Sequence, residues 1–216
     1  MIKILGEQNS ILNKFISELR NINVQNDRMR FRRNIERIGE IFAYEISKEL
    51  EYKTQKITTP LGTVDMNVTQ DNIVLATVLR AGLPLHQGLL NYFDYAQNAF
   101  VGSFRKYHKD NSFEIKSGYM SSPSVEGKHL ILSDPMLASG SSLVLAYKDL
   151  TKDEDPKHIH IATIIAAKEG IEYLEENLPK GKFTIWVGAI DKELTAKSYI
   201  VPGLGDAGDL AYGIKK

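Results

Sequence analysis

The chain has 216 residues, of which 43% are hydrophobic and 25% are charged, a composition typical of one globular domain with a sizeable core. Lysine plus arginine equals aspartate plus glutamate at 27 each, so the zero formal net charge argues against a protein that binds nucleic acid nonspecifically. The sequence has no cysteine, which excludes disulfides and thiolate zinc sites, and no apolar run near the roughly 20 residues of a membrane helix.

Two helices are predicted near the N-terminus. Residues 9–20 place apolar side chains on one face, and a longer helix follows Asp27, which can cap it. The apolar positions of this second helix, from Phe31 to Ile46, step by three or four residues. Its first turn carries four arginines, which fit either a solvated face with intersubunit ion pairs or an anion effector site: Arg28, Arg30, Arg32 and Arg33.

Strands and helices alternate from residue 73 onward. The continuous apolar run at 73–79 predicts a strand covered on both faces. Further strands are expected at 99–104, 129–132, 158–166 and 183–189, with helices from about 83 to 93, at 142–150 and at 169–177. This order indicates βαβ units, and therefore a mostly parallel sheet flanked by helices.

Two segments give weaker signals. Residues 63–68 alternate only faintly between apolar and polar. Residues 106–127 are polar with a turn signal at 109–112, which predicts a hairpin or a mobile loop. Residues 106–116 fit a flap over a site or part of a dimer arm.

An acid and a small-residue loop follow the strand at 129–132. Asp134 opens the sequence DPMLASGSS, and the loop 138–142 lies between a strand and a helix, where backbone N–H groups favour an anion. An ordinary capped turn would have the same composition, and no Walker motif is present. Asp134 would repel a phosphate but accept hydrogen bonds from a diol. The acid and the anion-binding loop together therefore indicate a sugar phosphate.

Two arginines follow predicted strands. Arg80 comes after the buried run 73–79, and Arg105 after 99–104. Ligands of a parallel sheet bind at the carboxyl ends of its strands, so Arg80, Asp134 and the loops after residues 166 and 190 are expected at one edge. Arg80 could simply form a salt bridge, but two separated guanidinium groups also suit a diphosphate.

The segment 199–209, YIVPGLGDAGD, is too rich in glycine, proline and aspartate for a regular element. It is either a plain C-terminal loop or one that offers bare backbone groups to a planar ligand. The histidines get no metal-binding role: His158 and His160 alternate along a strand, and His86, His108 and His129 are isolated. Trp186 is expected in the core.

DPMLASGSS, LRAG and above all YIVPGLGDAGD resemble the uracil phosphoribosyltransferases, a type I phosphoribosyltransferase family, over most of the chain from about residue 27. The family joins uracil to 5-phosphoribosyl 1-diphosphate (PRPP), giving UMP and diphosphate. The resemblance implies one domain over residues 1–216, an α/β fold with a central mostly parallel sheet flanked by helices. A small hood would be formed by the C-terminal base-binding loop and the N-terminal helices.

The resemblance also implies roles for individual residues. The catalytic group would be Asp206, Arg80, Arg105 and Asp134. PRPP would contact Arg80, Arg105, Asp134, Pro135, Met136, Leu137, Ala138, Ser139, Gly140, Ser141, Ser142 and Asp206. Uracil would contact Ile200, Gly205, Asp206 and Ala207. Magnesium would be bound mainly through the diphosphate of PRPP rather than by the protein alone, and the peptide after Arg80 can be cis in related enzymes.

The chain departs from the family pattern in places. The usual loop Ala-Thr-Gly-Gly-Ser is here residues 138–142, so Ser141 replaces a glycine, which is tolerable only where φ is not positive. Leu210 stands where a basic residue is common, and 106–127 matches poorly. Pro135 and Ala138 replace two acids of the broader phosphoribosyltransferase motif, as they do in the uracil branch.

The expected partners are uracil and PRPP, a possible GTP effector and further copies of the chain in a homodimer or larger homo-oligomer. No signal peptide is apparent, and a cytoplasmic protein without membrane or nucleic-acid partners is expected. Two alternatives stay open. One is a nucleotide-sensing RNA- or DNA-binding regulator on the same fold, and the other is a salvage enzyme for another base.

Overall fold

A central sheet organises the chain. The computed structural model describes residues 1–70, 72–107 and 113–215, and gives no side-chain description for 103–117. The strand order in the sheet is β1-β10-β9-β7-β4-β5-β6, and β8 pairs with β9. All of these pairs are parallel except β5 with β6. The strands span Ile2–Ile4 (β1), Ile73–Leu79 (β4), Gln97–Tyr107 (β5), Phe113–Ser121 (β6), His129–Ser133 (β7), Met136–Leu137 (β8), His158–Ala167 (β9) and Phe183–Asp191 (β10).

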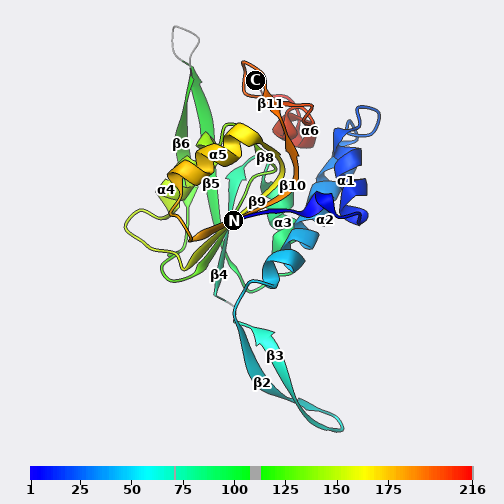
Figure 1. The fold of residues 1–216 in the computed structure, drawn as a ribbon, viewed down its shortest axis with the longest axis vertical. Helices are drawn as coiled ribbons and strands as arrows, with labels where there is room; N and C mark the ends of the chain where they lie inside the picture. The colour runs from blue at the N-terminus through cyan, green and yellow to red at the C-terminus, as the bar shows by residue number, and fades with distance from the viewer. Residues whose placement is uncertain (71, 108–112, 216) are drawn as a thin grey trace.

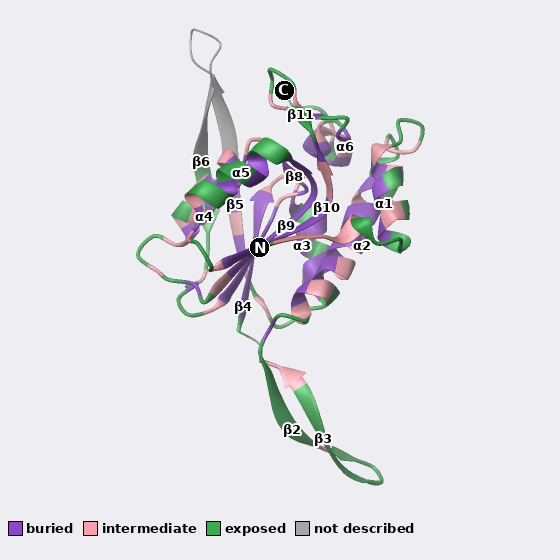
Figure 2. Ribbon diagram, in the orientation of Figure 1, coloured by how far each residue is buried: buried purple, intermediate pink, exposed green. Residues whose placement is uncertain are grey.

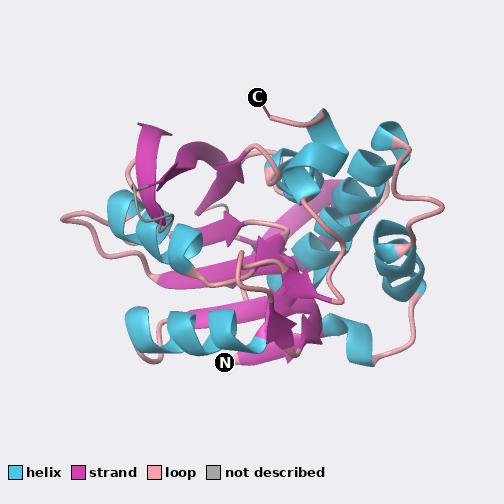
Figure 3. Ribbon diagram, turned by 90° about the horizontal axis from the view of Figure 1, so that it is seen from above, coloured by secondary structure: helices cyan, strands magenta, loops and turns pink. Residues whose placement is uncertain are grey.

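Helices cover both faces of this sheet (Figures 1 and 3). One face carries α1 (Ile11–Arg20), α2 (Arg28–Ser47) and α3 (Leu83–Leu90), and α6 (Ala207–Tyr212) joins the same core. The other face carries α4 (Ser141–Leu150) and α5 (Lys168–Asn177). The predicted α/β fold is therefore confirmed, and the predicted helices and sheet strands lie within a few residues of their expected bounds.

The apolar strands divide their side chains between two cores. In β4, Ile73 and Leu75 belong to the core under α2, whereas Val74, Ala76 and Val78 belong to the core under α4. Successive side chains of a strand point to opposite faces, so a strand covered on both sides needs apolar residues at every position. This explains the continuous apolar run that the sequence shows there.

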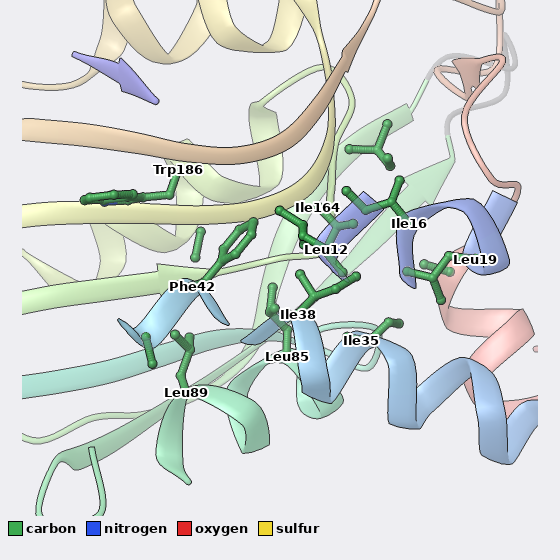
Figure 4. Packing of buried hydrophobic residues seen from close by; sticks show 14 of the residues in the cluster. Leu12, Ile16, Leu19, Ile35, Ile38, Phe42, Leu85, Leu89, Ile164 and Trp186 are labelled. Carbon is green, nitrogen blue, oxygen red and sulfur yellow. The ribbon is translucent and has the colours of Figure 1, made fainter. Parts of the chain in front are cut away.

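The core under α2 is built from the helical periodicity of that helix. Ile35, Ile38 and Phe42 are fully buried and face Leu85 and Leu89 of α3 (Figure 4). Burying one such side chain contributes about 1.5–3 kcal/mol. Asp27 caps α2 as predicted, because its side chain accepts a hydrogen bond from the Arg30 N–H at 3.0 Å.

Two hairpins extend from the sheet region. In the segment 106–127, strands β5 and β6 pair in antiparallel fashion, which confirms the hairpin of the two predicted alternatives, and residues 108–112 lie outside the described residues. The second hairpin joins β2 (Tyr52–Thr59) to β3 (Gly62–Thr69) and projects away from the body, exposed on nearly all sides (Figure 2). The sequence indicated β3 faintly and β2 not at all, because neither strand has a face to bury.

Small elements escaped the sequence analysis: β1, the 3-10 helix Leu5–Glu7, β8, α6, and the short pair β11 (Glu193–Leu194) with β12 (Ile200–Val201). The non-proline cis peptide lies between Leu79 and Arg80, so it precedes Arg80 rather than following it. In the described part of the chain, no helix combines the length and apolar character required to span a bilayer.

Candidate active site

One cavity of about 170 Å³ opens at the edge where the parallel strands end. Its first wall is the segment after β7, which includes Asp134 and the start of α4. Its second wall is the segment 198–208, about 60 residues further along the chain, which includes β12, an irregular loop and the start of α6. The lining residues are Ala81, Asp134, Met136, Leu137, Ala138, Ser139, Gly140, Ser142, Leu143, Ser198, Tyr199, Ile200, Gly205, Asp206, Ala207 and Gly208.

Asp134 is held at the floor of the cavity by backbone contacts. Its N–H donates to the Ala162 carbonyl at 3.1 Å, and its Oδ1 accepts from the Met136 N–H at 3.2 Å. Burial raises the pKa of Asp134 to about 7, because desolvation of the carboxylate outweighs the single hydrogen bond from Met136. Because the buried carboxylate of Asp134 has a single hydrogen-bond donor, hydroxyl groups of a ligand that donate to it would stabilise its charged form.

The start of α4 presents backbone donors to the cavity. Gly140 is the N-cap residue with a φ of 81°, and no side chain caps the helix. The first turn of a helix has N–H groups without intrahelical acceptors, which makes this turn a ready anion site. Gly140 cannot be replaced easily, because a Cβ there would lie 3.0 Å from the Gly170 carbonyl oxygen.

Ser141 is compatible with the loop. Asp153 and Ser198 are the non-glycine residues with positive φ in the described chain, so Ser141 has no left-handed conformation to support. Its hydroxyl lies 3.1 Å from that of Ser139. The replacement of the family's glycine therefore costs no backbone strain.

The second wall is a loop of irregular backbone. Gly203 and Gly205 adopt positive φ, and the Val201–Pro202 peptide is cis. A Cβ on Gly203 would overlap the Ile200 carbonyl oxygen. Asp206 ends the loop and caps α6, because its Oδ1 accepts from the Asp209 N–H at 2.9 Å. Gly203 and Gly205 are thus required by conformation. The prediction that residues 199–209 form no regular element is wrong, because β12 lies within them and α6 begins at Ala207.

Arg80 does not line the cavity, although its neighbour Ala81 does. Its guanidinium donates to Asp209 Oδ1 at 3.4 Å and to the Gly213 carbonyl at 3.3 Å. The salt-bridge alternative therefore describes this conformation. The Arg105 backbone lies in β5, opposite Ile115, but its side chain is outside the described residues.

Most of the expected site residues meet at the cavity, with some exceptions. Pro135 and Ser141 do not line it: the Pro135 carbonyl accepts from Ile164 and Ile165 instead. Sequence reasoning missed Ala81, Leu143, Ser198, Tyr199 and Gly208 as lining residues. Ala81 and Gly208 stood within the quoted motifs LRAG and YIVPGLGDAGD, but nothing in the sequence distinguished Ser198.

The four arginines of α2 are engaged mostly within the chain. Arg30 binds Glu18, Arg33 contacts Glu36 at 2.6 Å, and Arg32 donates to the Ala211 carbonyl at 2.7 Å. Arg28 lines a second cavity, of about 330 Å³, beside Gly205 and Leu210.

The histidines at the opposite end of the sheet contact one another. His160 accepts from the indole N–H of Trp186 at 3.1 Å and lies 3.2 Å from His129. Burial lowers the pKa of His160 to about 3. Trp186 is buried, as predicted.

A family model described as uracil phosphoribosyltransferase matches residues 6–214. A uracil phosphoribosyltransferase of Porphyromonas gingivalis is 56% identical over 211 residues, covering 98% of this chain and 97% of the relative. One of Methanococcus vannielii is 38% identical over 210 residues, covering 96% and 88%.

Solved structures agree on the fold. A protein from Aquifex aeolicus superposes with a TM-score of 0.87 at 29% identity, covering 99% of both chains. A hypoxanthine phosphoribosyltransferase from Staphylococcus aureus gives a TM-score of 0.51 at 15% identity, covering 87% of this chain and 84% of that one, which bears on the fold alone.

The raised pKa of Asp134 predicts a pH-dependent stability. Between about pH 4 and 7 the unfolded carboxyl ionises while the folded one keeps its proton, so rising pH favours the unfolded state in this window. Asn mimics the neutral carboxyl and can still accept from Met136. We expect Asp134→Asn to gain stability relative to the parent as pH rises through this window.

Urea unfolding of both proteins at about pH 4.5, 6 and 8 measures this difference, and all other acids cancel in the comparison. A difference in unfolding free energy that stays constant with pH would contradict the burial of the Asp134 charge.

Proposed function

The chain belongs to the uracil phosphoribosyltransferase family, and from this premise we propose how its cavity joins uracil to PRPP, giving UMP and diphosphate. The chain is a pentosyltransferase. The observation that carries the proposal is that Asp134, the first turn of α4 and the loop 198–208 line one cavity. These supply an acceptor for sugar hydroxyls, donors for a phosphate and backbone groups for a planar base.

The sugar phosphate would bind along the first wall. The 5-phosphate accepts from the free N–H groups and hydroxyls of 138–142, and the ribose diol donates to Asp134. Both partners come from one continuous segment between β7 and α4, so the distance between them is fixed by local structure. This segment therefore positions the pentose relative to the sheet.

Uracil would bind against the second wall, at Ile200, Gly205, Asp206 and Ala207. Base choice follows from the polarity of the backbone there. A backbone N–H that faces O4 of uracil can donate a hydrogen bond to it. Cytosine has an amino donor in the place of O4, so the two donors would face each other and both stay unpaired. The wall supports this reading because glycine exposes its backbone at Gly205, which lines the cavity.

The chemistry consists of breaking the C1–diphosphate bond while N1 of uracil attacks C1. Positive charge develops on the ribose and negative charge on the departing diphosphate. Holding the ring through Asp134 and the 5-phosphate places C1 in line with N1, and such positioning can supply up to roughly 7–11 kcal/mol. N1 loses its proton in the reaction, and Asp206 is the acid that lines the base side of the cavity.

The diphosphate needs cationic partners. Arg80 would supply one, after exchanging its contacts with Asp209 and Gly213, and Arg105 the other. The Arg80 pair with Asp209 is long and 40% exposed on the arginine side, so its loss costs little. Arg80 thus stays a predicted rather than a preformed contact.

Magnesium fits the site as a partner of the substrate. In the described chain, no group of three or more histidines or acids could hold a metal ion. The cavity does offer the carboxylates of Asp134 and Asp206, and Mg²⁺ prefers oxygen ligands. We propose that the ion arrives on the diphosphate, with Asp206 contacting it or its water. When bound, it supplies positive charge against the leaving group.

The comparisons lend no support to the regulator alternative. Assembly into a homo-oligomer, a GTP effector and a cytoplasmic location stay predictions from the resemblance. One domain over residues 1–216 is proposed on the same basis, and the family match over 6–214 supports it.

A base panel tests the proposed reaction. With PRPP and Mg²⁺, we expect UMP from uracil at a rate at least about 10³-fold above the rates with cytosine, hypoxanthine and orotate, because unpaired buried donors reject analogues strongly. Nucleotide formation is measured by chromatography. Preferred turnover of another base would contradict the assignment of uracil, and RNA binding without turnover would favour the regulator.

Asp206→Asn tests the acid on the base side. Asparagine caps helices as well as aspartate, so the variant should keep α6 and its thermal stability. We expect kcat to fall by at least about 10²-fold, because the carboxylate charge beside the reacting atoms is lost. Steady-state kinetics measure this.

Asp27→Asn is the matched control, since Asp27 caps α2 in the same way away from the cavity. It should leave turnover unchanged. Near-normal turnover of Asp206→Asn would refute the role of Asp206.

A further inference from the structure

An ion pair joins the first helix to the end of the last long strand. Arg20 is the final residue of α1, and Asp191 the final residue of β10. The two guanidinium nitrogens of Arg20 donate to the two carboxylate oxygens of Asp191 at 2.7 and 2.9 Å. This is the bidentate geometry of the strongest charge-assisted hydrogen bonds, and the Asp191 side chain is only 8% exposed.

The Arg20–Asp191 pair also forms hydrogen bonds with both backbone polar groups of Gly203, in the loop on the base side of the cavity. Asp191 Oδ2 accepts from the Gly203 N–H at 2.9 Å, and Arg20 Nη1 donates to the Gly203 carbonyl at 3.0 Å. Gly203 thus has its donor and its acceptor bonded to one ion pair. Because Gly203 has positive φ and no room for a Cβ, this contact fixes the loop at a residue where the backbone conformation requires glycine.

A second side chain from the same region supports the loop. Gln25, just after α1, donates from one amide nitrogen to the Leu19 carbonyl at 2.7 Å and to the Leu204 carbonyl at 3.1 Å. Neither Gly203 nor Leu204 lines the cavity, but Ile200 and Gly205 on either side of them do. The hydrogen bonds to Gly203 and Leu204 therefore support the second wall from the side that faces away from the cavity.

The anchor itself is rigid. Leu12, Ile16 and Leu19 bury the inner face of α1 in the core that it shares with α2 (Figure 4). Arg20 follows the fully buried Leu19, and Asp191 is held in the ladder opposite Ala167. A loop tied to a packed helix end and a paired strand end keeps its backbone groups in one place.

We propose that Arg20 and Asp191 are positioning residues for the base: their ion pair, the Gly203 clamp, holds the loop 200–206 in the conformation that binds uracil. The inference rests on the proposed function and deepens it. The clamp touches only the second wall, whereas the PRPP phosphate and ribose are assigned to the first. Loosening the clamp should therefore weaken uracil binding and leave PRPP binding nearly unchanged.

Arg20→Lys and Asp191→Asn test the clamp. Lysine keeps the charge but loses the fork that reaches Asp191 and Gly203 together. Because uracil would then have to order the loop as it binds, we expect KM for uracil to rise by about tenfold or more, with KM for PRPP changed less than about twofold. Hydrogen exchange at the Gly203 and Gly205 amides should accelerate.

Arg30→Lys is the matched control. Arg30 also makes a bidentate pair, with Glu18 at 2.9 Å for both bonds, but makes no bond to the loop. It should alter neither KM nor the exchange of the loop amides. Thermal melting of each variant separates a local loosening from unfolding.

A rise confined to the KM for uracil in both clamp variants supports the proposal. Equal rises in both KM values, or unchanged values with folded protein, overturn it. If the parent chain does not turn over uracil at all, the proposed function fails, and the exchange rates alone decide: faster loop exchange in Arg20→Lys supports the clamp, and unchanged exchange overturns it.

Discussion

The parallel pairing of β7, β9 and β10 is the constraint on which the site depends. Parallel strands end at the same edge, so the segments that follow β7 and β10, the two neighbours of β9, emerge at one edge although about 60 residues separate them in the chain. The first segment carries Asp134 and the free turn of α4, and the second carries the glycine loop and Asp206. A cavity with a sugar-phosphate wall and a base wall is the direct result of this topology.

The two walls are built by different means. The first is local: a strand, a short pairing at β8 and a helix start place Asp134 and the phosphate donors by sequence proximity. The second includes an irregular loop, and its course at Gly203 is held by hydrogen bonds with Arg20 and Asp191, which lie outside the loop. The N-terminal helices thus contribute to the site without lining the cavity, which gives the expected hood a physical role.

Much of this could be predicted from the sequence. The two-sided burial of β4 and the cap at Asp27 have local signatures in residue type and spacing, and both are confirmed. The small-residue segment 138–142 also has such a signature, and most of it lines the cavity, while its binding of a phosphate stays a prediction. What escaped depends on tertiary contacts. The β2–β3 hairpin buries neither face and so lacks a hydrophobic pattern, and the bonds of Arg20 to Asp191 and Gly203 join residues more than 170 positions apart. Arg80 was expected at the substrate, yet its partners in this conformation are Asp209 and Gly213, which no pattern around Arg80 indicated.

The central claim is that both walls bind one nucleotide, and a crystal structure of the chain with UMP and diphosphate tests it most directly. The account predicts the UMP phosphate at the first turn of α4, the ribose hydroxyls at Asp134 and the base against the backbone of 200–207. A nucleotide bound away from either wall, or with its base at the start of α4, would contradict it.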